Sequence, residues 1–178
     1  MVEKAIKFAT KMHEGQVRKG TTRPYIEHPL EVGRLVSEMT SDEEIISAAY
    51  LHDTVEDCNV TVEELEELFS PRVAHLVAQE SEDKKRSWQE RKQGTIDRLR
   101  NAPMDVRLIA MADKLSNIRD IERDYPEEGE AFWNRFSMKS KECIGWYYKG
   151  LKESLREGLS DTKQYQEYKE ICERIFGE

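Results

Sequence analysis

The sequence has few cysteines, no surplus of positive charge and no long apolar run. Its three cysteines, Cys58, Cys143 and Cys172, are widely spaced and form no C-x-x-C pair, which argues against a disulfide framework or a structural zinc site. Basic residues number 28 against 36 acidic ones, a formal charge of −8, so no overall positive field attracts nucleic acid or an anionic membrane. We therefore expect no nucleic-acid partner, although a local basic cluster could still bind a small polyanion.

Apolar stretches are too short for a signal peptide at the N-terminus or for a membrane span elsewhere. A cytoplasmic protein without a membrane partner is therefore expected. Runs that alternate between apolar and polar residues, as half-buried strands do, are missing as well. Because 178 residues without a linker-like segment fit one domain, we predict a single all-α domain over residues 1–178.

Helical periodicity and helix-start signals divide the chain into amphipathic segments. Apolar residues recur at helical spacing from Val2 to Met12 and again after Pro29. Capping patterns predict further helix starts at Ser41–Glu44, Thr61–Glu64, Ser70–Pro71 and Ser87–Glu90. Pro103 begins a long apolar-periodic helix, which Tyr125–Gly129 is expected to break. A helix of about 25 to 30 residues and a last helix over about 162–176 should follow.

The segment His52–Asp57 places one imidazole and three carboxylates directly behind an apolar run. Buried carboxylates either take up a proton or coordinate a cation, and a neighbouring imidazole adds a nitrogen ligand suited to a divalent transition metal. As one continuous helix, the segment would place His52 over Glu56 and Asp53 over Asp57. Adjacent side chains diverge on a helix, so the metal would have to lie beside it, between the two directions.

Other segments offer further ligands for the same metal. His28 precedes Pro29 at a helix start, and Asp113 lies within the long apolar helix, where a buried carboxylate needs a partner. The predicted metal shell is His28, His52, Asp53 and Asp113, with positions left for water. From spacing alone, histidines that are merely hydrogen-bonded remain an alternative, and we assign His13 and His75 to it.

Several other polar and aromatic residues have two interpretations. Glu56 and Asp57 could act on water or be surface carboxylates at a helix end. The basic loop residues Arg18, Lys19 and Arg23, like Lys114 and Arg119, could bind phosphate or form a solvated face. Aromatic residues near the C-terminus are expected in the core or a subunit contact rather than in a base-stacking platform: Trp133, Trp146, Tyr147 and Tyr148.

Four sequence blocks occur in a fixed order over about residues 3–120: HEGQVRK at 13–19, PYIEHP at 24–29, LHDTVED at 51–57 and ADKLSNIR at 112–119. Together they resemble the HD-domain metal-dependent phosphohydrolases, and among these the alarmone hydrolase domain of the RelA/SpoT type in its small stand-alone form. The C-terminal helices, about residues 127–176, add no diagnostic motif. The resemblance implies an all-helical HD-type bundle.

The same resemblance implies roles for individual residues. One divalent metal, usually Mn²⁺, is expected on His28, His52, Asp53 and Asp113. Glu56 and Asp57 are expected to assist the nucleophilic water, and the nucleotide site is expected to include Arg18, Lys19 and Asn117. The implied reaction removes the 3′-diphosphate from guanosine tetraphosphate or pentaphosphate, a small phosphorylated nucleotide. Tyr25 is expected to support the nearby loop, and the oligomeric state stays open.

Two departures from the family pattern bear on the substrate. Ser116 stands where the family often has histidine, and the charged stretch Gln79–Lys84 replaces a valine-threonine pair. These changes keep two alternatives open. One is an enzyme of the same kind that acts on another phosphorylated nucleotide or phosphoester, and the other is a non-catalytic helical protein that binds a nucleotide.

Overall fold

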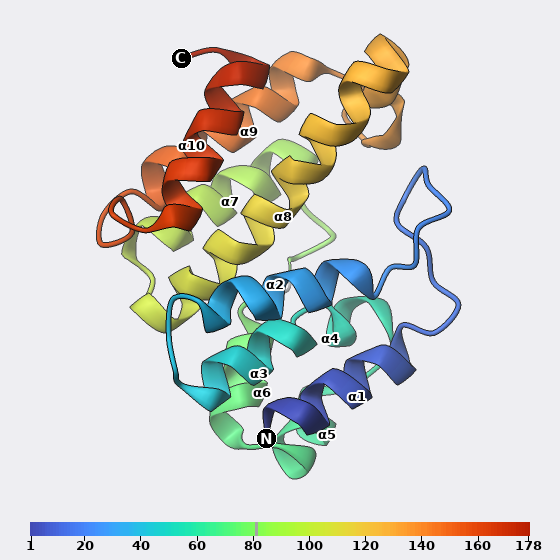
Figure 1. Ribbon diagram of the computed structural model, residues 1–178, viewed down its shortest axis with the longest axis vertical. Helices are drawn as coiled ribbons and strands as arrows, with labels where there is room; N and C mark the ends of the chain where they lie inside the picture. Colours follow the sequence, from blue (N-terminus) through green and yellow to red (C-terminus); the bar gives the residue numbers. More distant parts are fainter. Residues whose placement is uncertain (81) are drawn as a thin grey trace. The chain divides into compact units, whose positions relative to one another are not determined.

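The computed structural model describes residues 1–80 and 82–178, so Ser81 within the charged stretch Gln79–Lys84 lies outside the described residues. Its ribbon consists of helices and loops (Figure 1), and extended pairing in the described residues is limited to an isolated bridge between Val17 and Pro24. The all-α prediction is thereby confirmed. None of the helices in the described part of the chain is long and apolar enough to cross a bilayer.

The chain divides into two compact units, and the expectation of one domain over residues 1–178 stays a prediction. The first unit comprises Met1–Ser81 and Leu108–Asp113, and the second comprises Glu82–Arg107 and Lys114–Glu178. The long helix α8 (Met104–Glu128) contributes residues to both.

Helix α3 is the central element of the first unit. The unit contains α1 (Val2–Met12), α2 (Glu27–Ser37), α3 (Glu43–Leu51), α4 (Thr54–Asp57), α5 (Val62–Leu68) and α6 (Pro71–Ala78). Helix α3 packs against α1, α2 and α6, and all its residues from Ile45 to Leu51 are buried. A helix that is apolar on every side is stable only when neighbours surround it. This packing fixes the end of α3, where the segment His52–Asp57 begins.

The second unit is built around helix α9. It contains α7 (Trp88–Asn101), most of α8, the 3₁₀ helix η1 (Gly129–Arg135), α9 (Lys141–Ser154) and α10 (Lys163–Phe176), and α9 packs against both α7 and α10. Trp133, Tyr147 and Tyr148 are buried, as expected for core residues. Trp146 is 37% exposed, and its ring centre lies 6.2 Å from that of Trp88.

Most predicted helix starts are confirmed, because they depend on hydrogen bonds between close neighbours in sequence. Complete capping boxes form at Thr61–Glu64 and Ser87–Glu90, and the Ser70 hydroxyl accepts the N–H of Val73. The prediction at Ser41 is wrong. Asp42 caps α3 instead, because its carboxylate accepts the N–H groups of Glu44 and Ile45.

The predicted break at Tyr125–Gly129 is confirmed and falls at the end of that segment. Helix α8 continues through Pro126 to Glu128, and Gly129, with a φ of 65°, caps it. The predicted helix of about 25 to 30 residues that follows is replaced by η1 and the 14-residue α9. Tertiary contacts hold the last turn of α8 despite the proline, since the Tyr125 ring packs 4.9 Å from that of Trp133.

Candidate metal centre

The segment His52–Asp57 consists of a two-residue turn, His52 and Asp53, and the short helix α4, so the prediction of one continuous helix is wrong. Helix α3 ends at Leu51, and the four-residue α4 begins at Thr54, whose hydroxyl donates to the Leu51 carbonyl at 2.8 Å. Because the chain turns at His52 and Asp53, these adjacent side chains can face the same space. His52 Nε2 lies 3.0 Å from Oδ2 of Asp53.

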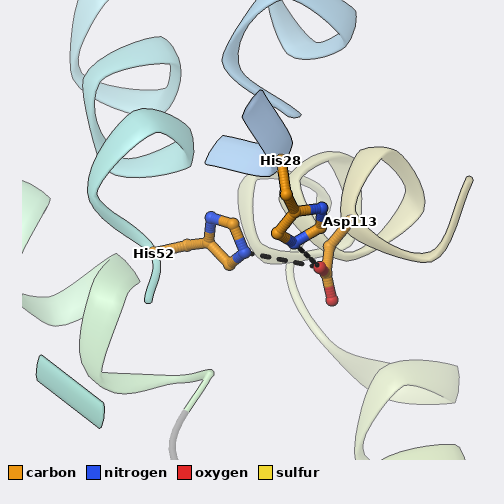
Figure 2. Close-up of side chains that lie close together, drawn as sticks. All are labelled: His28, His52 and Asp113. Carbon is orange, nitrogen blue, oxygen red and sulfur yellow. Dashed lines mark ion pairs between the residues drawn. The ribbon is translucent and has the colours of Figure 1, made fainter. Parts of the chain in front are cut away.

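His28 and Asp113 bring the remaining predicted ligands to the same place (Figure 2). His28 stands in the first turn of α2, and its Nε2 lies 3.0 Å from Oδ1 of Asp113 and 3.6 Å from Oδ2 of Asp53. His52 Nε2 lies 3.3 Å from Oδ1 of Asp113. His28, His52 and Asp113 are all buried and each offers one ligand atom, with these atoms within 4.8 Å of one another. All four candidate ligands therefore lie together.

The environment of His52 fits a metal ligand. Its Nδ1 lies 2.8 Å from the Ala49 carbonyl oxygen, which can only accept, so the neutral ring carries its proton on Nδ1. The lone pair on Nε2 then faces carboxylate oxygens, and this buried atom makes no hydrogen bond to the described residues. Two imidazole nitrogens and two carboxylates facing one another repel unless a cation lies between them, and the donor set suits a divalent transition metal.

The pKa shifts of this cluster also indicate a demand for positive charge. Burial lowers the pKa of His52, but Asp53 and Asp113 more than offset it, so that the pKa lies well above its usual value. Burial raises the pKa of Asp53, but His52 and His28 bring it well below its usual value. The site thus stabilises a proton when no metal is bound, and a metal would compete with that proton.

Tyr25 also contacts the cluster. From the sequence, this residue was expected only to support the nearby loop. Its hydroxyl donates to Oδ2 of Asp53 at 2.6 Å. Burial, followed by the charge of Asp53, raises the pKa of Tyr25 well above its usual value, so the hydroxyl keeps its proton. The signal in the sequence was its place three residues before His28, just ahead of the helix that carries this histidine.

Glu56 and Asp57, the predicted catalytic pair, lie in α4 and are exposed. Gln16 Nε2 donates to the Asp57 carbonyl at 3.1 Å, which ties the end of α4 to the loop after α1. Burial and the nearby Asp53 raise the pKa of the Asp57 carboxyl, although a hydrogen bond with Tyr25 opposes this. Asp57 therefore holds a proton more readily than an ordinary aspartate does.

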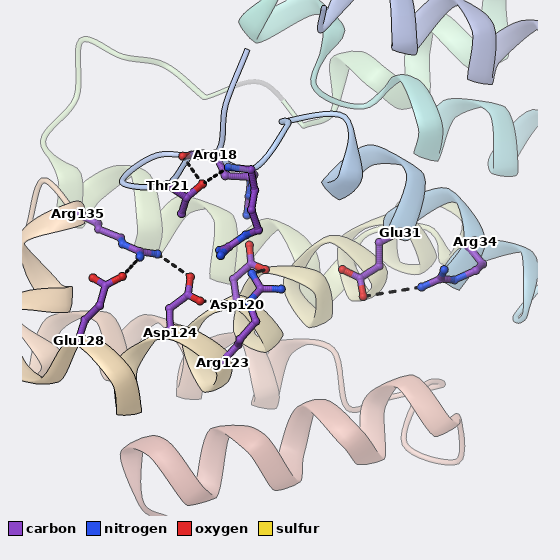
Figure 3. A network of polar contacts seen from close by, with 10 residues as sticks. Arg18, Thr21, Glu31, Arg34, Asp120, Arg123, Asp124, Glu128 and Arg135 are labelled. Atoms are coloured by element: carbon purple, nitrogen blue, oxygen red, sulfur yellow. Dashed lines mark hydrogen bonds and ion pairs between the residues drawn. The ribbon is translucent and has the colours of Figure 1, made fainter. Parts of the chain in front are cut away.

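Arg18 lies in a tight loop between α1 and α2. Its N–H donates to the Arg23 carbonyl at 2.9 Å, and Thr21 donates its N–H and its hydroxyl to the Arg18 carbonyl (Figure 3). Gly20 closes this turn with a φ of 75°, a conformation that favours glycine. The Arg18 guanidinium lies 5.3 Å from the centre of the Tyr25 ring.

The remaining candidate residues are not part of the cluster of His28, His52, Asp53 and Asp113. Lys19 is exposed, and Asn117 is half-buried in the part of α8 that belongs to the second unit. Their predicted roles in binding a nucleotide stay predictions. His13 is buried, with Nδ1 2.8 Å from Oε1 of Gln16, and His75 is exposed.

Comparisons with known proteins show which family this chain resembles. A family model described as HD domain matches residues 5–137, which include every predicted site residue. The guanosine-3′,5′-bis(diphosphate) 3′-pyrophosphohydrolase MESH1 of Xenopus tropicalis is 38% identical over 169 residues, covering 90% of this chain and 91% of its own.

Two solved structures resemble the whole fold. A metazoan ortholog of SpoT, described as hydrolysing ppGpp, matches with a TM-score of 0.82 and 29% identity, covering 97% of this chain and 94% of its own. A protein from Listeria monocytogenes matches with a TM-score of 0.76 and 32% identity, covering 85% of this chain and 99% of its own. The likeness therefore extends beyond the four sequence motifs to the C-terminal helices.

Proposed function

Because the chain belongs to the HD domain family, we propose that it is a metal-dependent phosphohydrolase that removes the 3′-diphosphate of guanosine tetraphosphate or pentaphosphate and releases pyrophosphate. The observation that carries the proposal is the buried cluster of His28, His52 and Asp113, with Asp53 beside it. Near full-length similarity to a protein named for this reaction supports the choice of substrate.

We propose that His28, His52, Asp53 and Asp113 hold one divalent metal. Their nitrogen and oxygen atoms suit manganese, iron, cobalt or zinc, and the family resemblance favours Mn²⁺. When bound, such an ion would supply Lewis-acid activation of water and of a phosphoryl oxygen. Tyr25 and Ala49 would orient the ligands Asp53 and His52 from behind.

The side chains of α4 would handle the protons. The Glu56 carboxylate accepts a proton from the attacking water, whose oxygen bonds to the phosphorus attached to the 3′ oxygen. The bond between that phosphorus and the 3′ oxygen breaks, so pyrophosphate is released, and the proton taken up by Glu56 passes to the 3′ oxygen. Asp57, with its raised pKa, helps to orient the water beside Glu56.

Basic and amide side chains would bind the nucleotide. The planar guanidinium of Arg18 can donate two parallel hydrogen bonds to a phosphate, and the exposed Lys19 adds a second positive charge in the same loop. Asn117 would contact the nucleotide through its amide. Binding through local cations is compatible with the net charge of −8, because only the immediate surroundings of the phosphates need to be positive.

The decisive experiment measures pyrophosphate release from guanosine tetraphosphate by metal-stripped protein, with and without added Mn²⁺. We expect release only with metal, and its loss in Asp113→Asn. Asp97→Asn is the matched control. This aspartate is exposed on helix α7, and the hydrogen bond described for its side chain is the one that it accepts from Gln93. Full activity of the metal-stripped protein, or of Asp113→Asn, would contradict the proposal.

The same assay separates the two alternatives. Ser116, buried where the family often has histidine, favours testing other phosphorylated nucleotides. If guanosine tetraphosphate is inert and another nucleotide is hydrolysed with Mn²⁺, the phosphohydrolase assignment stands with a different substrate. If nucleotides bind at saturating Mn²⁺ but none is hydrolysed, the protein is a nucleotide-binding module.

A further inference from the structure

Tyr25 is held in place by contacts on several sides. Its N–H donates to the Gln16 carbonyl at 2.8 Å, which closes the base of the loop that carries Arg18. Its ring centre lies 4.9 Å from that of the buried His13 and 6.0 Å from that of His28, the latter edge-to-face. A ring fixed by the backbone and by two aromatic neighbours can position other groups rather than follow them.

The hydroxyl of Tyr25 acts on the oxygen of Asp53 that faces the metal cluster. It donates to Oδ2 at 2.6 Å, and that same oxygen lies 3.0 Å from His52 Nε2 and 3.6 Å from His28 Nε2. Without this hydrogen bond the Asp53 carboxylate, whose side chain is 17% exposed, is free to rotate its ligand oxygen away from the imidazoles. The hydroxyl therefore controls the geometry of one ligand.

The face of the Tyr25 ring acts on Arg18. The guanidinium carbon lies 5.3 Å from the ring centre, within the range of a cation–π interaction. The main chain of Arg18 is fixed by the turn with Thr21 and Arg23, and the ring contact favours one direction of the guanidinium. One side chain thus contacts both a metal-ligand candidate and a phosphate-binding candidate.

We propose that Tyr25 is a positioning residue with two separable functions: its hydroxyl orients Asp53 for the metal, and its ring orients Arg18 for a phosphate group. The Arg18 part rests on the proposed function, whereas the Asp53 part requires only that a divalent metal binds the cluster. The two functions can be separated because Phe keeps the ring and removes the hydroxyl, while Leu removes both.

The test titrates Mn²⁺ into metal-stripped wild type, Tyr25→Phe, Tyr25→Leu and Arg18→Gln by calorimetry, and then titrates pyrophosphate into each Mn²⁺-saturated protein. Tyr25→Phe should weaken Mn²⁺ binding by about 10- to 100-fold, as removal of a ligand-orienting group does. Its pyrophosphate affinity should stay near that of wild type. Tyr25→Leu should lose Mn²⁺ affinity equally and also weaken pyrophosphate binding by about two- to fivefold.

Two controls make the result specific. Tyr165→Phe removes a comparable half-buried hydrogen bond, from its hydroxyl to the Lys152 carbonyl at 2.9 Å, and should leave Mn²⁺ affinity unchanged. In the Arg18→Gln background, Tyr25→Leu should add nothing to the loss of pyrophosphate affinity, because the ring has no guanidinium left to orient.

Each outcome decides one part of the proposal. Wild-type Mn²⁺ affinity in Tyr25→Phe would overturn the role of the hydroxyl, and wild-type pyrophosphate affinity in Tyr25→Leu would overturn that of the ring. If guanosine tetraphosphate is not hydrolysed but Tyr25→Phe still loses Mn²⁺ affinity, the proposed reaction fails and the positioning of Asp53 stands.

Discussion

The two units surround their buried or half-buried acidic residues with different partners. In the first unit, Asp53 and Asp113 face the imidazoles of two histidines. In the second unit, Asp124 and Glu82 face guanidinium and ammonium groups. Asp124 is only 5% exposed, and its oxygens lie 2.8 Å from Arg135 Nη1 and 3.1 Å from Arg123 Nε (Figure 3). Guanidinium groups carry their charge permanently, while an imidazole can release its proton and present a lone pair.

The contrast distinguishes two uses of a buried carboxylate. A carboxylate paired with arginine is already neutralised, so removing it leaves a charge without its partner and costs stability. A carboxylate grouped with imidazoles is neutralised by a proton or by a metal, so its removal costs metal binding. Burial of an acidic residue therefore indicates function only when its partners are known.

The largest effect is expected from removing a ligand of the cluster, as in His52→Gln. Loss of Lewis-acid chemistry is worth several kcal/mol, so kcat/KM with Mn²⁺ should fall roughly a thousandfold or more. Calorimetric titration should show Mn²⁺ binding lost as well, while circular dichroism of the metal-free variant shows a folded helical protein. Tight Mn²⁺ binding by this variant would remove the basis for treating the first unit as the metal unit.

Asp124→Asn should have the opposite profile. It leaves Arg135, whose side chain is 14% exposed, with Glu128 as its remaining carboxylate partner, so we expect a loss of about 2–3 kcal/mol in the free energy of unfolding. Mn²⁺ affinity should be unchanged. Urea unfolding of metal-free protein measures the first quantity and calorimetry the second. A weakened Mn²⁺ site with normal stability would reverse the comparison.

Gly33→Ala tests whether packing of α2 on α3 sets the distance between His28 and His52. A Cβ at Gly33 would fall on the Tyr50 ring of α3, so the helices must separate or the ring must move. We expect a loss of stability of about 1–3 kcal/mol and weaker Mn²⁺ binding. In contrast, Gly94→Ala in α7 has open space around its Cβ and should stabilise the protein by about 0.5–1 kcal/mol.

A small effect that depends on pH is expected at Glu82 in the second unit. Burial raises the pKa of this carboxyl, but Lys92, Lys114 and Arg91 bring it below its usual 4.5, with Arg91 Nη1 and Lys92 Nζ both 3.0 Å away. A depressed pKa in the folded state adds stability above pH 4.5 that is lost as the pH falls below it.

The free energy of unfolding of wild type should therefore exceed that of Glu82→Gln by about 1 kcal/mol at pH 7, and the difference should shrink as the pH falls below 4.5. Chemical unfolding of both proteins across this range measures the difference. A difference that stays constant with pH would mean that the ion pairs of Glu82 do not stabilise the folded state.

Local signals in the sequence were sufficient for much of the fold. The capping boxes at Thr61 and Ser87 and the final helix after Thr162 depend on hydrogen bonds that reach only three residues along the chain. The sequence failed where a distant contact changed the local preference. Within the predicted break at Tyr125–Gly129, packing of Tyr125 against η1 carries α8 past Pro126 as far as Glu128.

For the candidate site, too, the sequence predicted some features and missed others. The sequence identified His28, His52, Asp53 and Asp113 from their types and motifs, but not the turn that lets His52 and Asp53 face one space. Nor did it assign Tyr25 to Asp53, a contact between residues 28 positions apart.

By itself, the sequence determined that the chain forms amphipathic helices and which polar side chains are embedded in apolar segments, because both properties depend on neighbours within one helical turn. Tertiary structure alone decided which of these side chains meet. Asp113 and Asp124 look alike in the sequence, as aspartates in the same helix, yet one faces two imidazoles and the other two guanidinium groups. Arg123 is a neighbour in the same helix, but the two imidazoles and Arg135 come from other segments, and only the packing of α2, α3 and η1 brings those segments to the right turn of α8.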